Sequence, residues 1–441
     1  MSTSVAPVPV HARSVHARPV PPAGAGSASV RRDGAVDVVR AVCLTVVVVL
    51  HALMVGVSVG PRGPVLENAL DHWAFFPAAS WLVQVMPLFF ILGGFSAYGQ
   101  WSRLREAGGG YGDYLAGRLR RLLSPALTAI AAAAVLLSAL ALLGVPAADV
   151  AVAGFRLSQP LWFLGVYVLC TAAVPLLVAA HDRRPVASLA TLVTLALAVD
   201  VLRAATGIAA IGFVNLLFVW LLVQQLGFWL ASGRLDALRR GALAAIVAVA
   251  LGLAVVGAAS GLWSPDMYAA LNPPATALAL LGTAQLAVFL LLRHRLRTVS
   301  ARPVIGRIVD VVNRRAMTVY SWHMLALIML AGLLLVSGLA LPAPLSALWW
   351  ASRPLWLAVV VAAVAGLVAV AARAERGSAA ATPRVTVSAL RAAAAAACGA
   401  GGVLVVLLAG SSTAGWVAGA ALVFAALRIP RGSRVATALS R

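Results

Sequence analysis

Long apolar runs separated by short polar segments make up most of the chain from residue 38 to residue 428. Each run is close to the roughly 20 residues that an α-helix needs to cross the hydrocarbon core of a bilayer. The pattern therefore predicts an all-α, polytopic transmembrane helix bundle. It has about twelve spans, at 38–59, 80–101, 124–144, 161–180, 186–204, 211–231, 241–262, 274–292, 316–338, 354–372, 385–409 and 413–428.

The composition points to the same class of protein. Hydrophobic residues make up 62% of the chain, charged residues 11%, and the mean hydropathy is +0.97. These values are typical of a multi-pass membrane protein. The three cysteines, Cys43, Cys170 and Cys398, fall within apolar runs and show no motif spacing, so we expect neither a disulfide nor a metal site.

The charge pattern predicts how the chain is oriented. The net charge is +21 and all 34 basic residues are arginines, which cluster in short segments between the apolar runs. That distribution follows the positive-inside rule, so we expect the lipid bilayer, and no nucleic acid, as a partner. With the N-terminus on the cytoplasmic side, only Arg62, Arg156, Arg203 and Arg353 lie on the outer side of the membrane. The protein is therefore predicted to lie in the cell (inner or plasma) membrane, with both termini on the cytoplasmic side. The arginine- and alanine-rich usage hints at a bacterial genome.

The two ends of the chain differ from its centre. Residues 1–30 are rich in Pro, Ala, Val and Ser and lack the compact basic segment and cleavage site of a signal peptide. We interpret them as a disordered cytoplasmic tail. The spans at 385–409 and 413–428 hold no ionisable group in their apolar interior, and we assign them packing alone.

Three polar residues interrupt the first apolar run. Arg40 and His51 lie eleven residues apart, which is about three helical turns, so they share a face, and Asp37 precedes Arg40 by one turn on the same face. Charged side chains inside a bilayer usually face a protein interior or a wet cavity. The alternative is an arginine that extends to the headgroups beside a packed histidine. Because His51 is too deep to reach the headgroups, we favour a functional polar face.

A basic segment follows the second span. If it is helical, Arg118 and Arg121 face the same side, where two guanidinium groups would suit a phosphate-rich ligand arriving from the cytoplasm. The alternative is that these arginines enforce topology and contact anionic lipid.

Two further candidate pairs lie in later spans. Trp162 and Tyr167 open the fourth span, where the ordinary interpretation is an aromatic belt at the membrane interface. Tyr320 and His323 lie one turn apart in the ninth span, where a lone histidine often makes a hydrogen bond between helices.

Taken together, these segments resemble the acyltransferase 3 family of integral-membrane O-acyltransferases over residues 31–373, a core of ten spans. The remaining residues, 374–441, would then hold two additional spans and a short basic tail. The chain departs from the family pattern at Gly93, where many relatives have serine. The matching motifs occur in order: Arg40-x10-His51, Pro87-Leu-Phe-Phe-Ile-Leu-Gly-Gly-Phe95, Arg118-x-x-Arg121 with Pro125, Leu161-Trp162-Phe163-x3-Tyr167 and Thr318-x-Tyr320-x-x-His323.

The resemblance implies transfer of an acyl group, usually acetyl from acetyl-CoA, onto a hydroxyl of a carbohydrate or glycosylated acceptor. Acyl-CoA would be a donor substrate, with no permanently bound cofactor. The resemblance also implies that Arg40 and His51 are essential and that Arg118 and Arg121 meet CoA. Acyl transfer to a hydroxyl needs a base near neutrality, which suits His51. Arg40 has three open roles: holding phosphate, orienting the site, or offsetting charge on the thioester oxygen. Asp37 would orient Arg40.

Other classes of protein fit parts of the pattern. A twelve-span transporter or exporter shares the layout, but no repeat of six plus six spans is visible. A lipid-glycan flippase or a non-catalytic scaffold would tolerate joint replacement of Arg40 and His51. Because His51 lies past the midplane while Arg118 and Arg121 are cytoplasmic, we expect the donor to enter from inside and the acceptor to be met deep in the membrane or outside.

Overall fold

The computed structural model describes residues 33–60, 63–378 and 386–431 of the chain. The predicted disordered tail at 1–30 and most of the predicted basic tail lie outside the described residues. The described elements, in chain order, are α1 (Gly34–Met54), β1 (Val55–Gly60), β2 (Gly63–Asn68), η1 (Ala69–His72), α2 (Phe76–Val83), α3 (Met86–Glu106), α4 (Tyr111–Leu142), α5 (Ala147–Ser158), η2 (Gln159–Leu161), α6 (Trp162–Arg183), α7 (Pro185–Thr206), η3 (Ala209–Val214), α8 (Asn215–Ala231), α9 (Arg240–Ala259), α10 (Ala277–Ser300), α11 (Pro303–Arg314), α12 (Ala316–Val336), α13 (Ala347–Ser378), α14 (Ala389–Ala409), α15 (Thr413–Arg428) and η4 (Ile429–Arg431).

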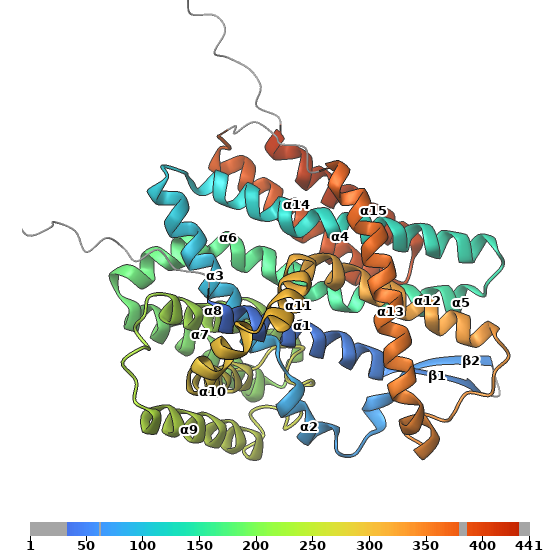
Figure 1. The fold of residues 1–441 in the computed structure, drawn as a ribbon, viewed down its shortest axis with the longest axis horizontal. Helices are drawn as coiled ribbons and strands as arrows, with labels where there is room; N and C mark the ends of the chain where they lie inside the picture. The colour runs from blue at the N-terminus through green and yellow to red at the C-terminus, as the bar shows by residue number, and fades with distance from the viewer. Residues whose placement is uncertain (1–32, 61–62, 379–385, 432–441) are drawn as a thin grey trace, which may run out of the picture. The chain divides into compact units, whose positions relative to one another are not determined.

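The prediction of an all-α, polytopic bundle is confirmed (Figure 1). Within the described residues, eleven helical segments are long and apolar enough to cross a membrane, and α15, with 16 residues, is a shorter apolar helix. The basic segment at 111–123 is helical, since α4 begins at Tyr111 and carries Arg118 and Arg121 into the following span without a break.

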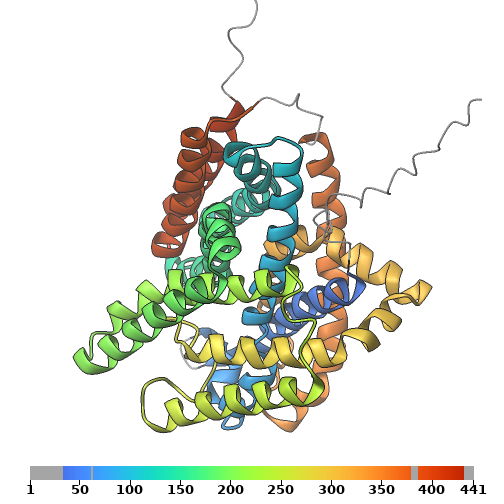
Figure 2. The same ribbon diagram turned by 90° about the vertical axis from the view of Figure 1, so that its left-hand side faces the viewer.

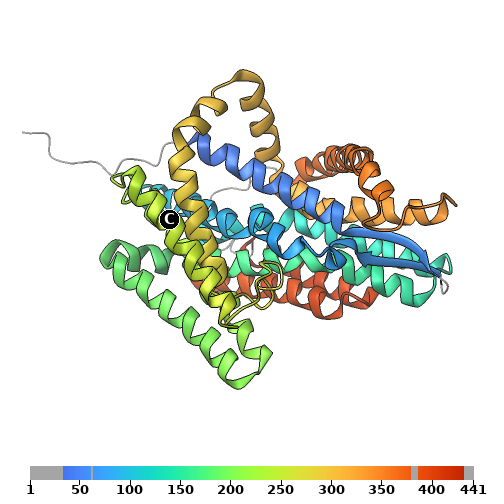
Figure 3. The ribbon, with the colours of Figure 1, turned by 90° about the horizontal axis from the view of Figure 1, so that it is seen from below.

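A β-hairpin replaces the predicted end of the first span. The helix α1 stops at Met54, and β1 and β2 continue in its direction as an antiparallel pair, from Val55 opposite Asn68 to Gly60 opposite Gly63 (Figure 3). Valines alternate with glycine or serine over residues 55–60. Alternating β-branched residues favour a strand, while glycine is a poor helix former, so the apolar run changes structure without losing hydropathy.

The helix α1 contacts α3, α10, α11, α12 and α13. Near its start, Val38 and Ala41 form an apolar cluster with Val309 of α11. Near its end, Leu50 packs with Leu70 and Phe76, which follow the hairpin. Both ends of the helix that carries Arg40 and His51 are therefore held by apolar packing.

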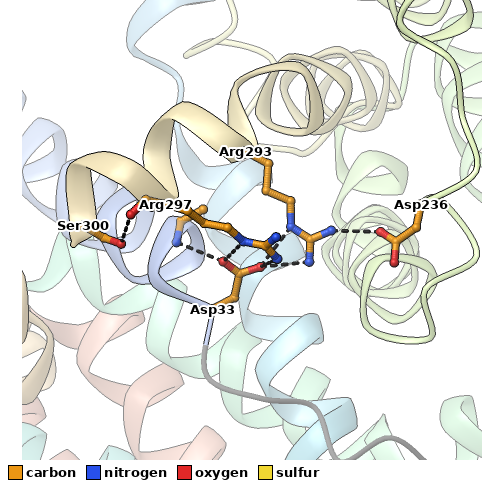
Figure 4. Close-up of polar contacts among 6 residues, drawn as sticks. Asp33, Asp236, Arg293, Arg297 and Ser300 are labelled. Carbon is orange, nitrogen blue, oxygen red and sulfur yellow. Dashed lines mark hydrogen bonds and ion pairs between the residues drawn. The ribbon is translucent and has the colours of Figure 1, made fainter.

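A buried carboxylate anchors the first turn of α1 to α10 (Figure 4). Asp33 caps the helix by accepting a hydrogen bond from the backbone N–H of Ala35 at 3.0 Å. Its carboxylate also accepts from Arg297 at 2.7 Å and pairs with Arg293 at 2.8 Å, and Arg293 in turn pairs with the exposed Asp236. Burial alone would raise the pKa of Asp33, but the hydrogen bonds from Arg297, Arg293 and Ala35 outweigh it and hold that pKa below its ordinary value.

Two glycines bring α3 and α8 into backbone contact. A Cβ atom on Gly94 would overlap the carbonyl of Gln224, and one on Gly227 would overlap the carbonyl of Ile91. Small residues allow membrane helices to approach this closely. Gly94, in the Gly-Gly pair of the second apolar run, is therefore a helix-packing residue.

The last two helices, α14 and α15, pack against α4, and α14 also packs against α6. Figure 2 shows them (red) on the side of the bundle opposite α9. Through α4 and α6 they support two of the helices that carry candidate site residues.

Candidate active site

A cavity of about 250 Å³ lies between α1, α3, α4, α6 and the junction of α11 with α12. Its lining includes residues from all five sequence motifs and from a segment that the motifs do not include. Its lining residues are Arg40, Leu44, Val47, Met86, Phe89, Ser96, Gln100, Arg118, Arg121, Leu122, Pro125, Phe163, Tyr167, Asn313, Arg314, Arg315, Ala316, Met317, Thr318 and Tyr320.

The lining is strongly cationic. The structure brings together Arg40, Arg118 and Arg121, which the sequence predicted, and adds Arg314 and Arg315 from the α11–α12 junction. Arginine stays protonated in proteins, and no lining residue among those described carries a carboxylate. Five guanidinium groups around one small cavity favour a ligand with several negative charges.

Neighbouring polar groups hold the arginines in place. Arg118 donates to the side-chain oxygen of Gln100 on α3 at 2.9 Å and to the hydroxyl of Tyr167 on α6 at 3.4 Å. Arg40 donates to the hydroxyl of Ser96 at 3.5 Å. These partners are neutral, so Arg118 and Arg40 keep their positive charge for an incoming anion.

The two intramembrane histidines meet beside the cavity. Nε2 of His323 lies 3.4 Å from Nδ1 of His51, and the ring centroids are 5.1 Å apart. Each Nδ1 also contacts a backbone carbonyl of a cavity-lining residue: His51 contacts Val47 at 2.9 Å and His323 contacts Tyr320 at 2.7 Å. On α1, Arg40, Leu44 and Val47 line the cavity, and His51 follows one turn later on the same face.

Aromatic packing fixes the position of α12 in the site. The hydroxyl of Tyr320 donates to the carbonyl of Pro160 at 2.7 Å, which joins α12 to the turn before α6. The ring of Phe163 lies 5.2 Å from that of Tyr320 and 5.4 Å from that of Tyr167. Tyr320 and Tyr167 therefore reach the cavity as parts of one aromatic group.

Two predicted site residues, Trp162 and Asp37, neither line the cavity nor belong to the histidine pair beside it. Trp162 packs against Trp220 of α8, with ring centroids 5.6 Å apart. Asp37 is half-buried, and its backbone carbonyl accepts a hydrogen bond from the side chain of Asn313 at 2.8 Å. That bond attaches the α11–α12 junction to α1.

Several cavity residues were missed by the sequence analysis. The motifs do not include Gln100, Asn313, Arg314 and Arg315. The two arginines belong to the arginine-rich segment between the eighth and ninth predicted spans, which does not distinguish them from its other arginines. The available signal was their position directly before the motif that contains Tyr320.

Comparison with known proteins agrees with the motifs. The sequence profile of the acyltransferase 3 family, described as an acyltransferase domain, matches residues 33–372, well over half of the chain. No curated protein and no solved structure matches the chain. The matched range includes every lining residue of the cavity and both histidines, while α14 and α15 lie beyond it. The chain therefore belongs to the acyltransferase 3 family, and it is a multi-pass membrane acyltransferase.

Proposed function

We propose that the protein transfers an acyl group, acetyl in the first instance, from acyl-CoA to a hydroxyl of a carbohydrate or glycosylated acceptor. The observation that carries the proposal is the cavity itself: five arginines line it, and His51 stands one helical turn beyond it on α1. A phosphorylated donor and a base for the acceptor hydroxyl would then meet in one site.

The arginines suit the phosphates of CoA. Arg118 and Arg121 on α4 approach the cavity from one element, and Arg314 and Arg315 from another. A guanidinium group binds phosphate oxygens through paired, charge-assisted hydrogen bonds. The thin pantetheine arm would extend along Leu44 and Val47 toward His51. In this arrangement the donor enters from the cytoplasmic side.

His51 would act as the base. Its free ring nitrogen takes the proton of the acceptor hydroxyl as the oxygen attacks the thioester carbonyl carbon. The carbon–sulfur bond then breaks, and His51 returns the proton to the departing thiolate, so the products are the acyl ester and free CoA. Arg40 would offset negative charge on the thioester oxygen or hold a phosphate. Asp37, at the start of the same helix, would support Arg40.

The test is a CoA-release assay on protein reconstituted in nanodiscs. Labelled acetyl-CoA is supplied with a panel of sugars and glycosylated acceptors, and both thiol release and acetylated product are measured. We expect release that requires an acceptor and that is lost in His51→Ala. Acceptor-dependent transfer that persists in His51→Ala, in protein that inserts normally, would refute the role of His51. A protein that neither binds acetyl-CoA nor releases thiol would refute the proposed donor and would favour the transporter alternative.

A further inference from the structure

The hydrogen bonds of the two histidines fix their tautomers. A backbone carbonyl can only accept, so the 2.9 Å contact between Nδ1 of His51 and the carbonyl of Val47 places a proton on Nδ1. By the same reasoning, the 2.7 Å contact with the carbonyl of Tyr320 places a proton on Nδ1 of His323. In the neutral state, Nε2 of each ring then carries a lone pair.

The lone pair of His323 faces the proton of His51. Nε2 of His323 lies 3.4 Å from Nδ1 of His51, so it is a second and weaker acceptor for the N–H that Val47 already accepts. Nε2 of His51 makes no hydrogen bond to any described residue, and it is therefore available to a substrate proton. His323 is fully buried, which leaves its ring little room to turn away.

We propose that His323 is a positioning residue for His51 and fills the place that a carboxylate fills in a serine–histidine–aspartate triad. This inference rests on the proposed function, because it concerns how His51 serves as base. As His51 gains a proton on Nε2, its ring becomes positive and its Nδ1–H becomes a stronger donor. The neutral lone pair of His323 then stabilises that charge and holds the ring in the tautomer whose Nε2 faces the acceptor.

A neutral histidine suits this position in the membrane. A carboxylate would have to be buried as a full negative charge, which is costly in an apolar interior. An imidazole offers a lone pair without a charge to bury. Its own Nδ1–H is already satisfied within α12 by the carbonyl of Tyr320, so the arrangement leaves no donor unpaired on His323.

The test compares three variants with the wild type in the CoA-release assay, with acceptor saturating. His323→Leu removes the lone pair and keeps the bulk. His323→Gln restores an acceptor, because the side-chain amide oxygen reaches the place of Nε2. Ser321→Ala is the control. It lies on the same helix, and the Ser321 hydroxyl has no hydrogen-bond partner among the described residues, so its removal leaves His323 in place.

We expect kcat to fall about tenfold to a hundredfold in His323→Leu, which corresponds to the loss of one hydrogen bond to a charged group. The KM and the dissociation constant for acetyl-CoA should stay within about twofold, because the arginines that would bind it lie elsewhere in the site. His323→Gln should recover most of kcat, and Ser321→Ala should match the wild type. In a His51→Ala background, His323→Leu should cause no further loss.

Three results would overturn the inference. They are a wild-type kcat in His323→Leu, equal loss of kcat in His323→Leu and His323→Gln, or a loss that appears in acetyl-CoA binding. If His323→Leu does not fold, the His323→Gln comparison decides alone, since a folded His323→Gln without activity contradicts the proposal. Failure of the proposed function is distinguished by the wild type, which would then release no CoA with any acceptor.

Discussion

Two pairs of arginines that line the cavity are held there in different ways. Arg118 and Arg121 are three residues apart on one helix, so their common direction follows from helical geometry. Arg314 and Arg315 reach the same cavity because Asn313 bonds to the carbonyl of Asp37, a contact between residues 276 positions apart. Local spacing carries no information about such a contact.

The cationic lining leads to a binding prediction. Replacing Arg314 and Arg315 together by alanine should weaken acetyl-CoA binding by about tenfold to a hundredfold for each arginine that binds a phosphate. Arg118→Ala with Arg121→Ala should have a similar effect. Isothermal titration with purified protein measures both dissociation constants.

The matched control is Arg120→Ala, on the same helix but outside the cavity lining. It should leave the dissociation constant unchanged. A second control uses acetyl-pantetheine, which lacks the nucleotide phosphates and should bind the wild type and both double variants equally. If the double variants bind acetyl-CoA as tightly as the wild type does, the arginines serve topology and lipid contact instead.

At the scale of single helices, the anchoring of α1 is open to a stability measurement. Asp33→Asn removes a buried charge that two arginines share, and it should lower the free energy of unfolding by about 2–3 kcal/mol. Asp236→Asn is the control, because it removes only a half-exposed ion pair with Arg293, which is worth less than about 1 kcal/mol. Equal effects of the two substitutions would contradict the anchoring role of Asp33.

The same anchor predicts a pH dependence. Because the folded state holds the pKa of Asp33 below its ordinary value, the carboxylate stabilises the fold fully above about pH 4. That stabilisation is lost as the pH falls from there through the lower pKa of the folded state. The difference in unfolding free energy between the wild type and Asp33→Asn should therefore be constant from about pH 5 to about pH 7 and shrink below about pH 4. A difference that grows on acidification would contradict this account.

The contact between α3 and α8 gives a second stability prediction. Gly227→Ala places a methyl group against the backbone of α3 and should lower the free energy of unfolding by about 1–3 kcal/mol. Gly252→Ala, in α9, meets no atom within 4 Å and should leave stability unchanged or raise it by up to about 1 kcal/mol. Thermal unfolding in detergent compares the two. If Gly227→Ala unfolds with the same free energy as the wild type, the close contact between α3 and α8 does not contribute to stability.

Hydropathy locates an apolar run but does not by itself show whether the run forms a helix or a strand. The apolar runs located the long apolar helices because span length and apolar composition are strong signals. Hydropathy does not reveal the strand β1, because it continues the first apolar run, and only the alternation of valine with small residues distinguishes it. The sequence alone does not decide whether residues 111–123 are helical, since a basic segment can be a loop or the extension of a span.

For the whole molecule, the open feature is whether α15 crosses the membrane. Its 16 residues span about 24 Å, short of the roughly 30 Å hydrocarbon core, a mismatch that local thinning of the bilayer can absorb. If α15 crosses, both termini lie on the cytoplasmic side, as the arginine distribution predicts.

Reporter fusions test this topology. A reporter fused after residue 410, in the turn between α14 and α15, should report the outer side, and one fused after residue 441 should report the cytoplasm. A reporter at the N-terminus should agree with the one after residue 441. If the fusions after residues 410 and 441 report the same side, α15 lies along the membrane instead of across it.

The central claim is that Arg40 and His51, on one face of α1, act in a single acyl-transfer step. The most direct measurement is the rate of acetyl transfer from acetyl-CoA for Arg40→Ala, His51→Ala and the double variant, each shown to be inserted. Residues that serve one step are not additive, so either single substitution should be nearly as damaging as both. Retention of transfer in either single variant, or in the double variant, would contradict the account.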